Sequence, residues 1–530
     1  MIRDFELENT GATLDCDLCI VGAGPAGIAM ADEFADGPLR VVLLDSGGLR
    51  LSDPTQALNV GVNAGLPHTG HVDGRGRAFG GTGRLWAGQC LPLDDIDFER
   101  RGWVPHSGWP IAPATLKAAY ARAEKFFKVQ GEVYDARVYS RLGLEAPAWD
   151  ERTLRSHFTI YTPEVDTGRF ALARVRASGN VTVLLNASVV QIELLESTAA
   201  VASLRLRSLG GRTGRVRARA YVLAAGGIEN ARLLLASNER VAAGVGNARD
   251  LVGRFFQEHP NGITATLDDA DPVALQARFR MLYREGRRYF PKFALAADRQ
   301  RSREVLNANA HLVFDDAPGS GIEALREFAK AARARRLPPA PLRAALRIAR
   351  DAVPVARTLA SYVTKGSAAS GTPKSVRLQC YLEQSPNPDS RVMLSDERDA
   401  VGLPQLKMHW AMSELEHSTL REMTTAVGEE FSRLGLGRVR PEAWVGSDGP
   451  EWRDHFVDCA HHSGTTRMAA SPSEGVVDPD ARVFGVANLW VAGSSVFPTS
   501  GYANPTLTIV ALALRLADRL QVELSTQVAA

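Results

Sequence analysis

The chain has 530 residues, of which 45% are apolar and 23% charged, and its formal net charge is +2. This composition is typical of a globular protein with a large core, and the length predicts two or more structural units. The nearly neutral charge excludes an electrostatic argument for nucleic acid or an anionic membrane as partner, which leaves small-molecule chemistry.

The two ends of the chain bear on its location. Residues 1–6 do not begin a basic segment followed by an apolar one, which predicts a cytoplasmic protein without a secretory signal. The longest apolar stretch near the other end, residues 507–520, contains Arg515 and Asp518 and is too short to cross a bilayer. No membrane span is therefore expected.

The cysteines are few and scattered: Cys16, Cys19, Cys90, Cys380 and Cys459. This spacing predicts no disulfide framework. Cys16 and Cys19 have the CxxC spacing of redox and zinc sites, but no second CxxC accompanies them, and they lead into an apolar run. We interpret them as packing side chains.

The first strong pattern is a strand, a glycine turn, a helix and a second strand. Residues 18–21 are an apolar run, 22–27 read GAGPAG, 28–34 have a helical pattern, and the apolar run 40–44 ends at Asp45. This order is that of a dinucleotide-binding βαβ unit. By itself it does not distinguish FAD from NAD.

Each part of this unit has a physical reason. Gly22 permits the tight turn, Gly24 lets the backbone approach a pyrophosphate, and Gly27 lets the helix pack closely on the strand. The helix N-terminus presents partial positive charge to the phosphates. Asp45 can accept hydrogen bonds from ribose hydroxyls.

Further segments indicate a nucleotide domain built from distant pieces. Residues 180–185 and 189–192 are interpreted as a pair of strands. Residues 221–227 form a strand that enters another glycine turn, and a helix follows over 228–236. The second turn allows close approach either to a cofactor or to another strand.

The character changes over residues 261–453. Residues 306–312 and 377–383 alternate like antiparallel strands, and we assign this region to a sheet that covers the substrate. Residues 323–359 are rich in Ala, Arg and Pro and predict two short basic helices around a Pro-rich turn. A solvated insertion is favoured there over a docking surface for a partner.

The C-terminal region contains the candidate catalytic residues. Residues 461–468 read HHSGTTRM, a strand follows over 488–493, and an apolar helix runs to Leu520. Asn504 suits the N-cap of that helix and Pro505 its first position. The positive end of the helix dipole there can stabilise negative charge on a reduced flavin.

His461 and Asn504 are the candidate catalytic pair. Oxidation of an alcohol requires the hydroxyl proton to leave, and a neutral imidazole is a natural base for it. An Asn amide can orient the same hydroxyl. A His-His pair alone is more often structural or metal-binding, but no third ligand stands nearby in the sequence, so no metal site is predicted.

The combined motifs resemble the glucose–methanol–choline (GMC) oxidoreductases across essentially the whole chain. The resemblance rests on GAGPAG, the Gly80-Gly81-Thr82 loop with Trp86 and Gly88, AAGGIENARLLL, HHSGTTRM and residues 501–508. Residues 103–110 and 384–392 are most similar to the branch of pyranose oxidases and glucoside 3-dehydrogenases.

The resemblance implies an α/β fold, with a Rossmann-like FAD-binding domain and a mixed-sheet substrate domain in a p-hydroxybenzoate-hydroxylase-like architecture. The FAD-binding domain is expected over residues 1–155, 175–260 and 454–530. The substrate domain is expected over 156–174 and 261–453, with the helical insertion near 323–365.

The resemblance also implies roles for single residues. His461 falls on the family's catalytic histidine, Asn504 on its His-or-Asn partner, and His462 ranks second. The implied FAD contacts are Gly22, Gly24, Pro25, Ala26, Gly27, Asp45, Ser46, Gly80, Gly81, Thr82, Trp86, Gly88, Val189, Ala225, Gly226, Gly493, Asn504, Pro505 and Thr506. Weaker candidates for substrate contact are Gln257, Glu258, His259, Glu383 and Gln384.

Two departures from the family's pattern matter. Some pyranose oxidases attach FAD through a histidine just before the tryptophan of the first glycine loop, whereas this chain has Leu85 before Trp86, which predicts noncovalent FAD. Arg84 also stands where relatives carry polar residues. It is either a determinant of redox or substrate properties or a surface charge.

The implied activity is oxidation of an alcohol carbon by hydride transfer to flavin N5, with a secondary, C3-type hydroxyl of a pyranose sugar or glycoside as the favoured target. The competing hypotheses are a primary or non-sugar alcohol, such as an aminoglycoside intermediate, a non-redox lyase, and a degenerate binding protein. The electron acceptor is oxygen, a quinone or a separate redox protein, and no CxxCH haem motif is present. The oligomeric state is not indicated.

Overall fold

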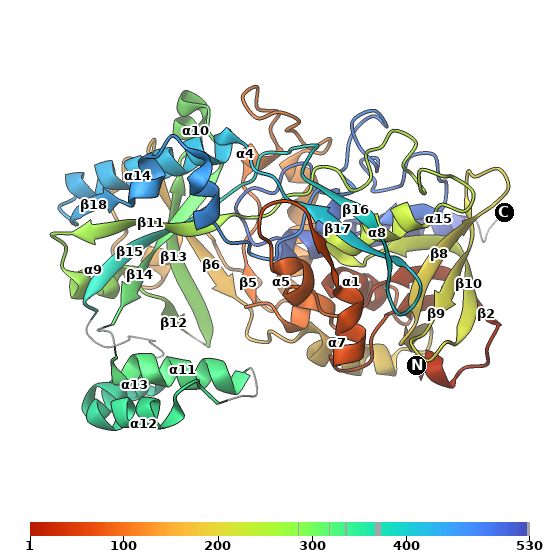
Figure 1. The fold of residues 1–530 in the computed structure, drawn as a ribbon, viewed down its shortest axis with the longest axis horizontal. Coiled ribbons are helices and arrows are strands. Elements are labelled where there is room, and N and C mark those ends of the chain that lie inside the picture. The colour runs from red at the N-terminus through yellow and green to blue at the C-terminus, as the bar shows by residue number, and fades with distance from the viewer. Residues whose placement is uncertain (285, 317–318, 334–336, 366–372, 527–530) are drawn as a thin grey trace.

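The computed structural model describes residues 1–284, 286–316, 319–333, 337–365 and 373–526. Two eight-stranded sheets stand at opposite ends of an elongated molecule, and helices cover both of them (Figure 1). This arrangement confirms the predicted α/β class. No helix among the described residues is long and apolar enough to cross a membrane.

The first sheet contains the predicted dinucleotide-binding unit. In spatial order its strands are β1 (Ile2–Asp4), β7 (Val181–Leu185), β3 (Val41–Leu44), β2 (Ala12–Val21), β10 (Thr213–Leu223), β9 (Val201–Arg207) and β8 (Ser188–Leu194), and β19 (Leu489–Val491) also pairs with β10. Leu18, Cys19 and Ile20 of β2 are fully buried, as expected for a central parallel strand. Cys16 and Cys19 are buried and unbridged.

The predicted strands over 180–185 and 189–192 both exist, but they do not form a pair. β7 lies between β1 and β3, whereas β8 pairs with β9 at the opposite edge. Local sequence could not reveal this separation, because the intervening places in the sheet are filled by strands from distant parts of the chain.

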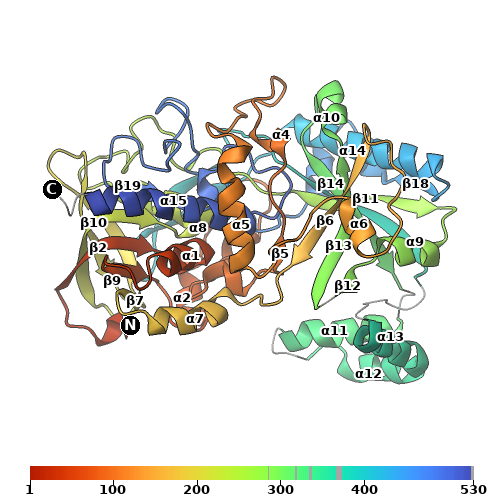
Figure 2. The ribbon, with the colours of Figure 1, turned by 180° about the vertical axis from the view of Figure 1, so that it is seen from behind.

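Helices cover the first sheet on both sides. α1 (Pro25–Glu33) packs against α15 (Thr506–Thr526) and α7 (Thr167–Ala177), and α5 (Lys117–Phe126) packs against α15 (Figure 2). α8 (Gly226–Ala236) packs against β8. The glycine turns before α1 and α8 and the start of α15 are thereby brought to one region.

The second sheet lies at the other end of the molecule. Its order is β18 (Arg438–Pro441), β11 (Asn261–Asp268), β15 (Ser375–Leu382), β14 (Ala308–Asp315), β13 (Arg287–Leu295), β6 (Leu154–Tyr161) and β5 (Gln89–Cys90), with β12 (Leu282–Arg284) on β13. All pairings given for these strands are antiparallel, so this sheet is not mixed as expected.

One face of the second sheet is covered by α14 (Glu414–Arg433). Successive side chains of a strand point to opposite faces. In β15, Cys380 is fully buried on the α14 side, whereas Tyr381 lines the cavity between the glycine turns and the start of α15. The face opposite α14 therefore turns toward the candidate site.

Three segments differ from the expected domain boundaries. β16 (Arg391–Arg398) and β17 (Pro404–His409) form a small sheet with β4 (Gly61–Asn63), and β16 packs on α8. α7 packs on α1, although 156–174 was assigned to the substrate domain. β5, assigned to the FAD-binding domain, belongs to the second sheet.

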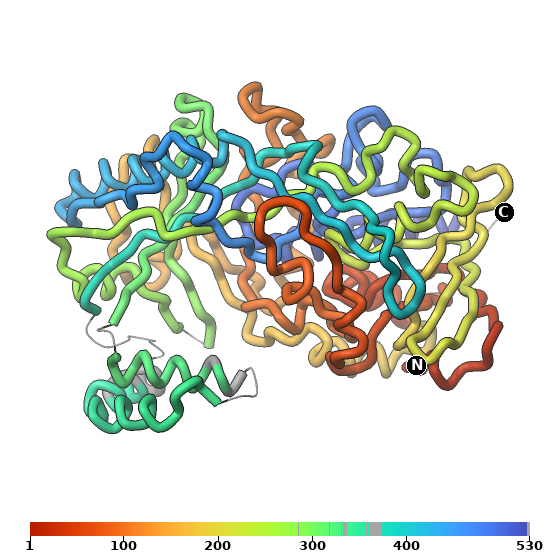
Figure 3. The backbone as a smooth tube through the Cα atoms, viewed as in Figure 1, coloured from red at the N-terminus to blue at the C-terminus, as the bar shows by residue number. Residues whose placement is uncertain are grey.

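The insertion contains three helices rather than two. α11 (Gly321–Arg333), α12 (Pro341–Arg350) and α13 (Ala352–Lys365) pack on one another and stand apart from the second sheet (Figures 1 and 3). Pro354 falls in the first turn of α13, where proline is tolerated, so it does not end the helical region. Residues 334–336, which fall within the predicted Pro-rich turn, lie outside the described residues.

The remaining helices are short. They are α2 (Asp53–Gln56), α3 (Gly70–Asp73), α4 (Asp95–Phe98), α6 (Arg137–Arg141), α9 (Pro272–Phe279) and α10 (Ala297–Arg303). The 3₁₀ helices are Phe5–Leu7, Ala57–Asn59, Gly81–Arg84, Pro113–Leu116, Ala443–Gly446, Pro450–His455 and Ser494–Val496.

Candidate active site

A cavity of about 520 Å³ extends from the turn before α1 to the start of α15. Of the predicted FAD contacts, it is lined by Gly22, Gly24, Pro25, Ala26, Asp45, Ser46, Gly81, Thr82, Trp86, Val189, Ala225, Gly226, Gly493, Asn504, Pro505 and Thr506. Gly27, Gly80 and Gly88 do not line it. The volume is in the range of small-molecule and cofactor sites.

The first glycine turn has the shape that a bound pyrophosphate requires. Gly22 has φ of 108°, and a Cβ there would lie 2.5 Å from the carbonyl oxygen of Ala224. A Cβ on Gly27 would lie 2.0 Å from the carbonyl oxygen of Gly22, so Gly27 serves close packing. A Cβ on Gly24 would meet nothing within 4 Å and would project into the cavity. α1 begins without a side-chain cap, which leaves its first N–H groups for a ligand.

Asp45 ends β3 at the cavity wall. Its carboxylate accepts the N–H of Ala23 at 3.0 Å and that of Gly47 at 2.8 Å, which joins it to the turn. Burial raises the pKa of Asp45 to about 6. Each oxygen retains a free lone pair for a ribose hydroxyl.

Buried and half-buried charged side chains that we did not predict line the same cavity. Arg75 and Arg77 both pair with Glu229, each at 2.9 Å, and Arg77 also donates to the Ser46 hydroxyl at 3.1 Å. The nearby arginines hold the pKa of Glu229 far below its usual value, against burial. Arginines scattered along a sequence carry no signal that they will converge, so this network was not predictable.

His461 and Asn504 meet at the other end of the cavity. The Asn504 amide nitrogen lies 3.4 Å from His461 Nε2, and both side chains are partly exposed to the cavity. α15 starts at Thr506, and the carbonyl of Pro505 accepts the N–H of Ile509 at 2.8 Å. Pro505 thus occupies the N-cap, one residue later than expected. Asn504 does not cap the helix, and its amide faces His461.

The ring of His461 is held by a second histidine. His259 Nδ1 lies 2.9 Å from His461 Nδ1, and the two rings meet edge to face. Because the Asn504 amide nitrogen can only donate, His461 Nε2 accepts and its proton sits on Nδ1, which donates to His259. Burial, reinforced by His259 and Lys292, lowers the pKa of His461 well below its ordinary value. His461 is therefore a neutral imidazole with a lone pair facing the cavity.

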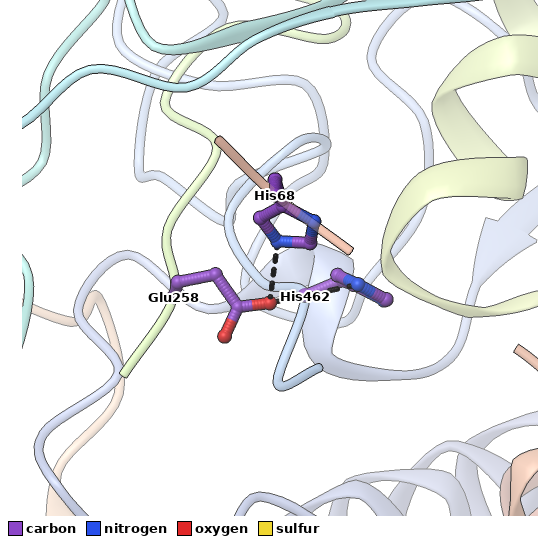
Figure 4. Close-up of side chains that lie close together, drawn as sticks. All are labelled: His68, Glu258 and His462. Atoms are coloured by element: carbon purple, nitrogen blue, oxygen red, sulfur yellow. Dashed lines mark hydrogen bonds and ion pairs between the residues drawn. The ribbon is translucent and has the colours of Figure 1, made fainter. Parts of the chain in front are cut away.

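A buried carboxylate supports this arrangement from behind. Glu258 Oε2 accepts the backbone N–H groups of His259 at 3.1 Å, Cys459 at 3.4 Å and His461 at 3.0 Å. Its Oε1 lies 3.1 Å from His68 Nε2 (Figure 4). Glu258 thus holds the backbone of the loop that carries His461.

His462 faces a different environment from His461. Its ring points toward Glu258 and His68, with Nε2 at 3.5 Å from Glu258 Oε1, and it packs against Phe256 (Figure 4). Burial lowers the pKa of His462 well below its ordinary value. The histidine that lies beside Asn504 is therefore His461, and not His462.

His68, Glu258 and His462 together form a group with the spacing of metal ligands, so the fold supplies next to His462 a third candidate ligand that is absent from the neighbouring sequence. His68 comes from a segment nearly four hundred residues away in the chain, which sequence spacing could not show. However, His68 Nδ1 accepts the N–H of His71 at 3.1 Å, so its proton sits on Nε2 and is donated to Glu258. An imidazole nitrogen that carries a proton is not a metal ligand.

Two of the proposed substrate contacts are structural instead. Both carboxylate oxygens of Glu383 pair with Arg101, at 2.6 and 2.8 Å. Gln384 accepts from Glu258 N–H and Trp410 Nε1 and donates to the carbonyl of Ala411, each at 2.9 Å. Glu383 and Gln384 are fully buried and their polar atoms have protein partners, so they do not contact substrate.

Gln257 and His259, two further proposed contacts, are also buried. Gln257 donates to the carbonyl of Pro498 at 3.1 Å, and His259 orients His461. Arg84 donates to the carbonyls of Leu49 and Phe79 and pairs with Asp166, so the structure favours a structural role for it. Leu85 lines the cavity beside Trp86.

Comparison with known proteins shows what the chain is similar to. A family model described as GMC oxidoreductase matches residues 386–513. The chain is 25% identical to the 6'''-hydroxyparomomycin C oxidase of Streptomyces lividus over 97% of this chain and 93% of that protein. It is 32% identical to the C-glycoside 3-oxidase of Microbacterium trichothecenolyticum, over 29% of this chain and 28% of that protein.

A solved structure of a formate oxidase has the same fold. It superposes with a TM-score of 0.57 at 17% identity and covers 97% of this chain and 99% of that chain. The space above Gly24, the acceptor at Asp45 and the neutral His461 fit a bound dinucleotide and the oxidation of an alcohol. The match of residues 386–513 to the GMC oxidoreductase model and the similarity to sugar and aminoglycoside oxidases support an FAD-dependent oxidoreductase that acts on CH–OH groups.

Proposed function

We propose that the chain oxidises a secondary, C3-type hydroxyl of a pyranose sugar or glycoside and binds its FAD noncovalently. The observation that carries the proposal is the neutral His461 beside Asn504, both facing the cavity. Leu85 supports noncovalent binding, because it offers no nucleophile where some pyranose oxidases attach the flavin.

In this proposal each residue of the site has a separate role in alcohol oxidation. His461 Nε2 takes the hydroxyl proton, and the Asn504 amide donates to the same hydroxyl oxygen and orients it. The resulting imidazolium of His461 is stabilised because His259 Nδ1 accepts the hydrogen bond that His461 Nδ1–H donates. When bound, FAD supplies the acceptor for the hydride. The start of α15 places a positive helix end beside the cavity, where negative charge is stabilised.

The position of attack is supported by one relative and opposed by another. A C3 hydroxyl agrees with the relative named C-glycoside 3-oxidase, which matches part of the chain. The relative that matches nearly the whole chain is named for hydroxyparomomycin, and it favours an aminoglycoside alcohol as the second candidate. Both relatives are named oxidases, which supports oxygen as acceptor over a quinone or a separate redox protein.

The test is an anaerobic titration of the purified flavoprotein, with the flavin's visible absorbance as readout. Methyl glucoside is compared with its 3-deoxy and 6-deoxy forms. Bleaching by the 6-deoxy but not the 3-deoxy sugar is expected for attack at C3, and the reverse pattern would favour the primary alcohol. His461→Ala is the matched control, since it should retain FAD without bleaching.

The same samples test the electron acceptor, a lyase reaction and the attachment of the flavin. Admission of oxygen restores the oxidised spectrum rapidly if the enzyme is an oxidase. A flavin that stays oxidised with every sugar and aminosugar would contradict the proposal and favour a lyase. Acid precipitation should release the flavin into the supernatant, and a yellow pellet would refute noncovalent binding.

A further inference from the structure

A row of polar side chains crosses the second sheet on the face turned away from α14. Lys292 of β13 stands directly opposite His157 of β6. His311 of β14 stands opposite Gln379 of β15, one step beyond the Phe293–Ala310 pair of β13 and β14. These four strands are neighbours in the sheet (Figure 1), and the pairings place the four side chains in one continuous row.

Lys292 is a buried cation, and no described carboxylate forms an ion pair with it. Its side chain is 6% exposed, and its Nζ lies 3.5 Å from Gln89 Oε1. The rings of Phe290 and Tyr381 lie 5.4 and 5.3 Å from Nζ, which offsets part of the cost of burial. Burial lowers the pKa of Lys292 to about 8. The ammonium group is therefore still charged at neutral pH.

The neighbours of Lys292 have unused hydrogen-bonding atoms. Both ring nitrogens of His157, Nδ1 of His311 and Oδ1 of Asn309 are buried without a partner among the described residues. Burial lowers the pKa of His311 to about 3, so its ring is neutral and one of its nitrogens carries an N–H. Each neutral imidazole carries one N–H, so His157 and His311 offer buried donors beside the Lys292 ammonium. Buried donors nearly always have partners, so this group of donors points to a ligand that accepts hydrogen bonds.

The row adjoins the cavity that holds the catalytic pair. Gln89 and Tyr381, which both contact the Lys292 ammonium, line that cavity. The charge of Lys292 contributes to the low pKa of His461, which places the ammonium within electrostatic range of the base. Lys292, His157 and His311 do not themselves line the cavity, so a substituent of a substrate bound beside His461 reaches them past Gln89 and Tyr381.

We propose that Lys292, His157 and His311 form a substrate subsite for a carboxylate, so that the preferred sugar or glycoside is acidic. This inference rests on the proposed sugar-alcohol oxidation and narrows its substrate class. A carboxylate accepts from the Lys292 ammonium and from the N–H groups of the two neutral imidazoles. An ammonium group at the same place would be repelled by Lys292 and would find no anion among the described residues of the row. The cationic aminoglycosides are disfavoured accordingly.

The test uses three sugars that share the C3 hydroxyl and differ only at C6. They are methyl glucuronide with a carboxylate, methyl glucoside with a hydroxyl, and methyl 6-amino-6-deoxyglucoside with an ammonium. Binding to the FAD-loaded enzyme is measured by perturbation of the oxidised flavin spectrum and by calorimetry, and flavin bleaching is followed in the same anaerobic samples. The glucuronide should bind roughly tenfold to hundredfold more tightly than the glucoside, as expected for charge-assisted hydrogen bonds.

Lys292→Met should abolish this preference while the affinity for the glucoside changes little, and Lys292→Arg should retain most of it. Lys128→Met is the matched control, because Lys128 is an exposed lysine paired with Glu164 on the surface. Equal binding of the three sugars, no binding of any, or an equal loss for all three in Lys292→Met would overturn the subsite. Tight, Lys292-dependent binding of the glucuronide without bleaching by any sugar would support the subsite and refute the proposed oxidation.

Discussion

Replacing Glu258 by glutamine should slow flavin reduction without removing FAD. The carboxylate is fully buried and accepts three backbone N–H groups and the His68 Nε2 proton. An amide presents its NH₂ to at least one of these donors, and the bonds that remain lose their charge assistance. Each buried donor left without a charged acceptor costs about 1.5–3 kcal/mol. The loop is expected to relieve this cost by moving, which displaces His461.

A displacement of about 1 Å at a catalytic group can cost roughly 100-fold in rate. We expect the limiting rate of anaerobic flavin reduction in Glu258→Gln to fall by roughly 10- to 100-fold, with flavin content and substrate affinity nearly unchanged. Stopped-flow reduction at saturating sugar gives the rate, and the visible spectrum of the purified variant gives the flavin content.

Glu416→Gln is the matched control for Glu258→Gln. Glu416 is also fully buried and also accepts several donors, from Ser413 and Ser385, but these belong to the cap of α14 and to the segment after β15 rather than to the loop that carries His461. Burial raises the pKa of Glu416 to about 7, so both variants are compared at a pH above this value. A similar loss of thermal stability in the two variants with no selective loss of reduction rate in Glu258→Gln would refute the positioning role.

Further predictions concern the base, the turn, the subsite and the cluster behind the loop. His461→Ala should lower the rate of flavin reduction roughly 10²- to 10⁴-fold. In the wild type this rate should stay constant between about pH 6 and 8, because the lowered pKa of His461 keeps the base unprotonated there. A rate that titrates near the ordinary histidine pKa would contradict this. Gly24→Val should yield folded protein with little flavin because its side chain enters the cavity, whereas Gly27→Ala should lower thermal stability through its clash with the turn. The affinity for methyl glucuronide should weaken as the pH rises above about 8, where Lys292 loses its charge, while that for methyl glucoside should not. Dialysis against EDTA should leave the rate of flavin reduction unchanged, because His68 Nε2 carries a proton and donates it to Glu258 where a metal would bind. A loss of activity that a divalent ion restores would show that the cluster holds a metal.

Local patterns in the sequence were sufficient for the parts of the site that are built from contiguous residues. A Cβ on Gly27 would clash with the carbonyl of Gly22 within the same turn, so the steric role of Gly27 can be derived from spacing alone. The clash at Gly22 is with Ala224, which only the fold brings near. The pairing of His461 with Asn504 was expected from family resemblance, and the structure brings the two side chains within 3.4 Å.

Neighbouring polar residues were harder to interpret, because a polar side chain has the same appearance in the sequence whether it binds substrate or protein. Glu383 appeared suited to a sugar, but its partner Arg101 is 282 residues away. Gln384 is occupied in the same manner by Trp410 and the backbone of Glu258. Their exclusion from the substrate site depends on hydrogen bonds that only the folded chain forms.

The sequence by itself thus determined the class of fold and the glycine turn of the βαβ unit, and it singled out His461 as the proposed base. The tertiary structure alone decided what surrounds that base: Glu258 behind its loop, His259 at its Nδ1, and Lys292 on the facing sheet. The physical reason is that burial and electrostatic interactions depend on distance in space. Strand β6 brings His157 into one row with Lys292 and His311 of β13 and β14, more than a hundred residues further along the chain, which no local pattern encodes.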